Sequence, residues 1–149
     1  MNYETAYEKY SLKPLRAVLL ALAVAGDIAA VILFFSALAE PLFFAAVAAL
    51  VVFDFILRRI SLKIVYSYRY VLHGGRVEIY YEIIGKSRLV LTLEQGVKLT
   101  PAEENSAGKR LYGDDHAYLF SVKVGDKDYV VSLDAFMYSV LEVQSDISG

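Results

Sequence analysis

Two aspartates are the residues of this chain whose type and position could carry chemistry. Asp27 is the only charged residue from Ala17 to Ala39, and Asp54 is the only charged residue from Leu42 to Leu57. Asp27 lies 13 residues before Glu40, and Asp54 lies 14 residues after it. If the two apolar runs are antiparallel helices joined near Glu40, both carboxyl groups lie at a similar depth.

The two carboxyl groups have three interpretations. An ionised carboxylate at membrane depth is costly, so it must be neutral, paired or hydrated. The pair shares a proton or binds a cation, or it contacts a partner protein, or it provides polar contacts that stabilise two helices. In the third case Asp54 pairs with Arg58, one helical turn later. Asp27 then forms a hydrogen bond across the hairpin or to another subunit.

No other group of residues has the spacing of a catalytic or metal site. Asp114, Asp115 and His116 are consecutive, but neighbouring residues of a strand point to opposite faces and do not form a dyad. The chain has no Cys and only two His residues, too few for a zinc site built from protein ligands alone. It has no Gly-rich phosphate loop and no Ser-His-Asp set. We therefore expect a protein that is not an enzyme and binds no cofactor or metal.

The helices that must position the aspartates are predicted to form a transmembrane hairpin over residues 15–58. The first apolar run is long enough to cross about 30 Å of hydrocarbon, whereas the second needs its flanks or a thinner bilayer. Neither run has a polar face, and Pro14 and Pro41 stand where helices begin. The alternative is a cleaved signal peptide, because small residues recur at Ala21-Leu22-Ala23 and at Ala37-Leu38-Ala39.

Positive charge predicts the orientation of the hairpin. Basic residues flank the hairpin at both ends, whereas the only charged residue of the connecting turn is Glu40. We therefore expect a multi-pass protein of the cell (inner) membrane with both termini in the cytoplasm. The flanking basic residues are Lys9, Lys13, Arg16, Arg58, Arg59 and Lys63.

Residues 1–14 form a polar N-terminal segment. Tyr3, Tyr7 and Tyr10 recur at helical spacing, which predicts a short helix with one aromatic face lying along the membrane interface. The alternative is a terminus that packs on the protein or frays.

Residues 63–145 are predicted to form a β-rich cytoplasmic domain. Segments of period-two alternation predict strands at residues 63–72, 76–84, 88–93, 97–100, 116–124 and 129–133. Pro101–Gly113 is predicted to be a polar, mobile loop. Asp134 is the predicted N-cap of a final helix over residues 135–144, with Phe136 in an apolar stripe that lies on the sheet. The expected fold class is a membrane α-helical hairpin plus an α+β domain, an antiparallel β-meander or barrel capped by a C-terminal helix.

Composition and charge narrow the function further. The chain is 57% hydrophobic with a mean hydropathy of +0.45, and its net charge is −2. Because acidic and basic residues are mixed along the β-rich domain and form no basic stripe, a nucleic-acid partner is not expected.

After the hairpin, the sequence predicts a meander of strands closed by a helix. Two segments are typical of this arrangement, namely Tyr68-Arg69-Tyr70-Val71-Leu72-His73-Gly74-Gly75-Arg76-Val77-Glu78-Ile79 and Asp134-Ala135-Phe136-Met137-Tyr138. In this architecture the chain resembles bacterial PH-like domain membrane proteins, among them an uncharacterised two-span family. The resemblance implies a PH-like domain that acts as a membrane-tethered interaction or scaffold module. It supplies no catalytic residues.

Three functions follow from these observations. The first is a non-enzymatic, membrane-anchored module that binds a protein partner or self-associates. The second is an accessory subunit of a membrane transporter or enzyme complex, engaged through the hairpin. The third is an anionic-lipid sensor. The alternative is that its candidate contact residues lie on solvated strand faces and bind no lipid. These residues are Arg69, His73, Arg76, Lys86 and Arg88.

Overall fold

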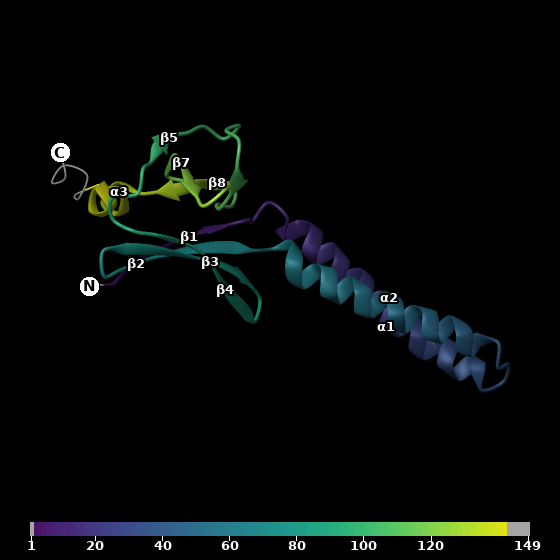
Figure 1. Cartoon of the computed structure of the whole chain (residues 1–149). Coiled ribbons are helices and arrows are strands. Elements are labelled where there is room, and N and C mark those ends of the chain that lie inside the picture. The colour runs from purple at the N-terminus through teal and green to yellow at the C-terminus, as the bar shows by residue number, and fades with distance from the viewer. Residues whose placement is uncertain (1, 143–149) are drawn as a thin grey trace. The chain divides into compact units, whose positions relative to one another are not determined.

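The computed structural model describes residues 2–142 and divides the chain into two compact units (Figure 1). A helical unit comprises Ser11–Val65, and a β-rich unit comprises the residues through Tyr10 together with those from Tyr66 on. The β-rich unit is therefore built from two pieces of sequence that lie on either side of the helical unit. The coarse expectation of helices plus antiparallel sheets is confirmed.

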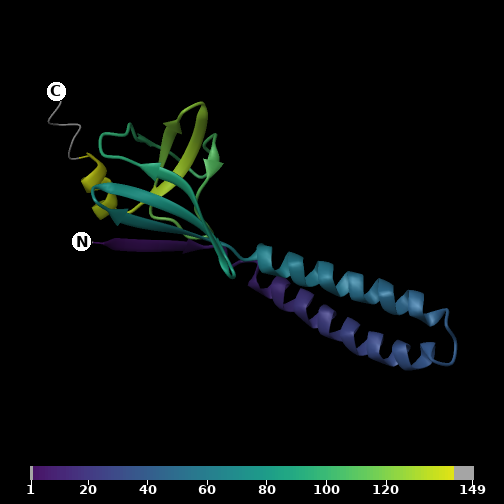
Figure 2. The same cartoon turned by 60° about the horizontal axis from the view of Figure 1, so that its bottom comes forward.

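The helical unit is a hairpin of two antiparallel helices, α1 (Lys13–Ala37) and α2 (Phe43–Ile64) (Figure 2). Pro14 lies in the first turn of α1, where a missing N–H costs no hydrogen bond. In the connecting turn, the N–H groups of Ala39 and Glu40 donate to the carbonyl oxygen of Ser36 at 3.1 Å. The buried residues of the two helices are Ala23, Ala37, Leu57 and Ser61.

Only part of the predicted transmembrane hairpin is supported by the helices themselves. Within the described residues, α1 is the one helix that is long and apolar enough to cross a membrane. Helix α2 does not meet the same standard, because Asp54, Arg58 and Arg59 lie within the length that would have to cross. The prediction of a transmembrane hairpin over residues 15–58 is therefore supported by the composition of α1 and not by that of α2.

The N-terminal segment is a strand, not the expected helix. Strand β1 (Tyr3–Glu8) pairs antiparallel with β2 (Ser67–His73), with Glu8 opposite Ser67. Its inward face holds Tyr7, which is buried, and Tyr3, which packs against the core. The residues at positions 3, 5 and 7 alternate with exposed ones, so the period is two. The extended conformation of β1 depends on pairing with β2, which follows the whole helical unit along the chain.

Strands β1 and β2 belong to the first of two four-stranded sheets. The first sheet has the order β1-β2-β3-β4, and the second has the order β5-β7-β8-β6. The remaining bounds are β3 (Arg76–Ile83), β4 (Lys86–Leu93), β5 (Thr100–Pro101), β6 (Lys109–Arg110), β7 (Tyr118–Val124) and β8 (Lys127–Leu133). The strand predicted at residues 97–100 is therefore the two-residue β5, which pairs with β7.

The two sheets and helix α3 (Ala135–Glu142) share one hydrophobic core. Asp134 caps α3 as predicted, because its Oδ1 accepts a hydrogen bond from the N–H of Met137 at 2.8 Å. Met137 and Leu141 are buried, whereas Phe136 is 43% exposed and makes an edge contact with the ring of Tyr3. Phe136 therefore does not lie in the buried stripe. The part of the predicted helix beyond residue 142 lies outside the described residues.

The segment Pro101–Gly113 is only partly the polar loop that was predicted. Lys109 and Arg110 form β6, which pairs parallel to β8. Leu111 is fully buried and Tyr112 is 7% exposed. The prediction of a polar loop is wrong at this end because two large apolar side chains follow the polar residues and fill the core.

Candidate functional site

The polar cluster of the helical hairpin joins Asp27 of α1 with Asp54 and Arg58 of α2. Arg58 donates from Nε to Oδ1 and Oδ2 of Asp54 at 3.0 and 2.9 Å, across one helical turn. It donates from Nη2 to Oδ2 of Asp27 at 2.5 Å, across the hairpin. One guanidinium therefore bridges both aspartates. The intrahelical pair is the one that the spacing predicts.

This cluster is open on one side. The side chains of Asp27 and Arg58 are 51% and 46% exposed, whereas that of Asp54 is 18% exposed. Oδ1 of Asp27 accepts no hydrogen bond from the described residues. With two carboxylates and one guanidinium, the ionised cluster carries a net charge of −1. The charge and the free oxygen together leave the cluster able to bind one further cation or donor.

The basic residues near the first β-hairpin turn are engaged by neighbours. Arg69 binds Glu82 at 2.7 Å and Glu4 at 3.3 Å, and its guanidinium lies 5.0 Å from the ring centroid of Tyr80. The hydrogen bond to Glu82 raises the pKa of Arg69, so the guanidinium stays charged. His73 binds Asn2 at 2.7 Å. These side chains stabilise the sheet surface.

Arg76 also has an acidic neighbour on its own strand, because its Nε lies 3.4 Å from Glu78. Lys86 and Arg88 differ from Arg69, His73 and Arg76. Both are exposed, and neither side chain forms a hydrogen bond or ion pair with the part of the chain that the structure describes. They line a shallow pocket of about 210 Å³ with Tyr81, Ile83 and Ser87. Of the five predicted lipid contacts, these two are the ones without a polar side-chain partner among the described residues.

Next to that pocket lies a cluster of three tyrosines. The rings of Tyr66 and Tyr68 have centroids 5.7 Å apart, and that of Tyr81 lies 5.4 Å from Tyr68. Burial raises the pKa of Tyr68 to about 12. Tyr81 lies opposite both Tyr68 of β2 and Arg88 of β4. The cluster is a cross-strand row, as expected for aromatic residues of a sheet.

Asp114, Asp115 and His116 bind separate partners and form no dyad. Asp114 binds Lys9 at 2.7 Å, and Asp115 accepts a hydrogen bond from Tyr10 at 3.1 Å. His116 binds Glu104 through Nε2 at 2.8 Å. Hydrogen bonds to the carbonyl of Ala117 and then to Glu104 raise the pKa of His116. The first two contacts hold Lys9 and Tyr10, which lie between β1 and α1.

The small size of Gly113 is the one feature of the sequence that indicates this docking of residues 8–10. A Cβ at Gly113 would lie 2.4 Å from the carbonyl carbon and oxygen of Glu8. The N–H of Asp114 donates to that same carbonyl at 3.1 Å. Gly113 therefore lets the backbone after β1 approach the backbone of the 111–116 segment.

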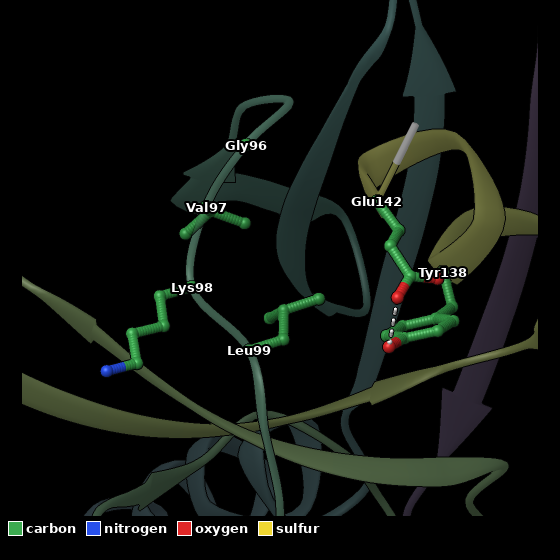
Figure 3. A pocket seen from close by; sticks show the side chains of 6 residues that line it. All are labelled: Gly96, Val97, Lys98, Leu99, Tyr138 and Glu142. Carbon is green, nitrogen blue, oxygen red and sulfur yellow. Dashed lines mark hydrogen bonds between the residues drawn. The ribbon is translucent and has the colours of Figure 1, made fainter. Parts of the chain in front are cut away.

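A second shallow pocket, of about 260 Å³, lies between the 96–99 segment and α3 (Figure 3). Leu99 points toward Tyr138, whose hydroxyl donates to Glu142 at 3.0 Å, whereas Lys98 points away. Tyr138 also stacks on Phe120 with ring centroids 4.7 Å apart. The pocket has no convergent set of polar groups for chemistry.

Within residues 2–142, no three His, Cys, Asp or Glu side chains are grouped so that they could hold a metal ion. Comparison with family models, curated proteins and solved structures found no match to this chain. Its function must therefore be argued from the two units and their polar contacts.

Proposed function

We propose that the chain is a non-enzymatic, membrane-anchored interaction module. The helical hairpin crosses the cell (inner) membrane twice and holds a PH-like β-rich domain in the cytoplasm. The domain binds a protein partner or a second copy of the chain. The observation that carries the proposal is the pairing of β1 with β2, the two strands that flank the hairpin.

This pairing constrains the membrane topology. Strand β1 precedes α1 and β2 follows α2, so both ends of the hairpin are on the same side of any membrane that it enters. If α1 crosses, the chain must return before β2. The segment available for the return is α2. Pairing therefore supports a second span despite the charges of α2.

The composition of the helices is compatible with this arrangement. Only 6% of the apolar stretch of α1 is buried within the protein, unlike the core helix of a water-soluble protein. In α2, Arg58, Arg59 and Lys63 lie near the end that precedes β2, as the positive-inside rule requires. The part from Phe43 to Leu57 is about 22 Å long, so the bilayer must thin or the arginines must reach its surface.

Cleavage of α1 as a signal peptide fits the fold poorly. Cleavage after Ala23 or Ala39 would remove β1 from the sheet. It would also remove Tyr7 from the core, where this residue makes an edge contact with Tyr70 at 5.2 Å between ring centroids. The loss would expose the edge of β2.

Single-cysteine labelling tests the topology, because the chain has no cysteine of its own. Glu40→Cys places a thiol in the connecting turn, and Asp126→Cys places one in the exposed β7–β8 turn. In intact spheroplasts, a membrane-impermeant maleimide should label Glu40→Cys, and should label Asp126→Cys only after permeabilisation. Equal labelling of both variants before permeabilisation would contradict the two-span arrangement.

Purification from native membranes in mild detergent tests the interaction role. We expect either a stoichiometric partner protein or a homo-oligomer. A chain that is monomeric and free of partners at every detergent concentration would refute that role while leaving the topology standing.

Two alternative functions are each supported by one observation. The half-exposed Asp27 favours an accessory subunit of a transporter or enzyme complex, engaged through the hairpin. Lys86 and Arg88, which have no ion pair among the described residues, favour contact with anionic lipid. The lipid alternative fails if the wild-type protein associates equally with vesicles that contain anionic lipid and with vesicles that lack it.

A further inference from the structure

We propose that the Asp27–Asp54–Arg58 cluster is a docking site for a transmembrane helix of another protein that carries a basic residue in its apolar span. This inference rests on the proposed membrane insertion and names the chemistry of one partner. It starts from the exposure of Asp27 and Arg58, and from the exposed apolar side chains that surround Asp27 on α1.

The depth of Asp27 makes its exposure costly. Ten residues separate Asp27 from Ala37 at the end of α1, which is about 15 Å of helix. Asp27 therefore lies within the hydrocarbon core, between its middle and the cytoplasmic side where α2 carries Arg58 and Arg59. Its neighbours one turn away on the exposed surface, Val24 and Val31, are 52% and 56% exposed. A charged group placed among lipid-facing valines requires a further partner.

Charge selects the kind of partner. Arg58 neutralises one carboxylate, and the second leaves the cluster at −1. Oδ1 of Asp27 accepts no hydrogen bond within residues 2–142, so it can accept one from outside the hairpin. A Lys or Arg side chain supplies both one positive charge and the missing donor. The interaction is strong because the surrounding lipid has a low dielectric constant.

The same charge argues against a second copy of the hairpin at this site. A second copy would bring another cluster with a charge of −1 close to the first, and like charges in a low-dielectric medium repel. The two clusters together would still lack counter-charge. A heterologous basic helix therefore fits the site better than self-association does.

Energy transfer between labelled helices in vesicles tests the inference with the full chain. The donor is attached to Asp126→Cys protein reconstituted in phosphatidylcholine vesicles at pH 7. The acceptor is on a synthetic leucine-rich span with Lys at its centre, or on the same span with Leu there. We expect roughly tenfold tighter association with the Lys span, a size typical of strong polar contacts between membrane helices.

Variants at two acidic residues separate the cluster from general charge effects. Asp27→Asn makes the cluster neutral and should remove the preference for the Lys span. Asp27→Glu keeps the charge and should retain it. Glu40→Gln, in the connecting turn, is the matched control and should retain it as well.

The outcomes distinguish this inference from the proposed function. Insertion is measured in the same vesicles by labelling of Glu40→Cys. If the hairpin is not inserted, the proposed function fails and the inference fails with it. If the hairpin is inserted but the two spans bind equally, only the inference is overturned. A preference that persists in Asp27→Asn, or association between labelled copies that exceeds binding of the Lys span, also overturns it.

Discussion

The backbone N–H of Lys9 donates to the carbonyl oxygen of Tyr66 at 2.8 Å. Along the chain, Lys9 precedes the helical unit Ser11–Val65 and Tyr66 follows it. The hydrogen bond extends the β1–β2 ladder by one step beyond Glu8 and Ser67. The helical hairpin is therefore an insertion in a β-hairpin, at the position where a short turn would otherwise stand.

Excision of the insertion should leave a folded domain. A variant in which an Asn-Gly turn replaces residues 11–65 keeps β1 and β2 adjacent. We expect a water-soluble protein that unfolds in one cooperative thermal transition, followed by circular dichroism. The control is the chain from Tyr66 onward, which lacks β1 and the buried Tyr7. Equal stability of the two variants would show that β1 is dispensable.

Tyr70 is the polar group that joins the two sheets inside the core. Its hydroxyl donates to the carbonyl oxygen of Leu111 and accepts from the N–H of Ser132 at 3.1 Å. Tyr70→Phe should lower the free energy of unfolding by about 1–3 kcal/mol, because it leaves buried backbone groups unpaired. Urea unfolding of the excised domain measures this loss. Tyr118→Phe, at a residue that is 65% exposed, is the control and should have little effect.

Alkaline pH should destabilise the β-rich unit. Burial raises the pKa of Tyr70 far above its usual value and that of Tyr68 to about 12. Because both groups ionise near pH 10 when unfolded, their stabilising effect is complete below that pH and is lost as the pH rises through the native values. Urea unfolding at pH 9 and pH 11 should show this fall. The fall should be smaller in Tyr68→Phe; an unchanged pH dependence would contradict the assignment.

Gly113→Ala should weaken the docking of the segment before α1. The added methyl group would overlap the carbonyl of Glu8, so the backbone must shift, at a cost of about 1–3 kcal/mol. Gly26→Ala is the matched control, because a Cβ at Gly26 meets nothing within 4 Å. Thermal unfolding of the full chain in detergent compares them. A Gly113→Ala protein as stable as Gly26→Ala would refute the close approach.

Removal of Arg58 should destabilise the helical hairpin. Arg58→Leu leaves Asp27 and Asp54 without their shared counter-charge, whereas replacement of all three residues by Leu removes the need for one. We expect a lower yield of inserted protein for the single variant and recovery for the triple one. Arg59→Leu serves as the control because Arg59 is exposed and forms no ion pair with the described residues.

Local patterns predicted several features correctly. The N-cap at Asp134, the strands on either side of Gly74 and the ion pair of Asp54 with Arg58 follow from residues within a few positions of one another. The predicted start of the first of these strands at residue 63 is wrong, because α2 continues to Ile64 and β2 begins at Ser67. The apolar character of α1 likewise follows from its own composition. Such features are encoded locally because a helical turn or a two-strand hairpin closes over short distances along the chain.

Other features depend on distant residues, and the sequence misled or was silent there. The tyrosines of β1 recur at a spacing that also suits a helix, and only the edge of β2 selects the strand. Leu111 follows polar residues in a segment that was predicted to be a loop. It is buried in the core because β6, which precedes it, pairs with β8.

The sequence by itself determined the apolar helices, the intrahelical ion pair and the period-two strands β2, β3, β4, β7 and β8. Tertiary structure decided that Arg58 reaches Asp27 and that Tyr70 joins two sheets. It also decided that residues 3–8 complete a sheet begun after the hairpin. The physical reason is that these contacts join residues far apart along the chain, so their register depends on how whole elements pack and on no local pattern.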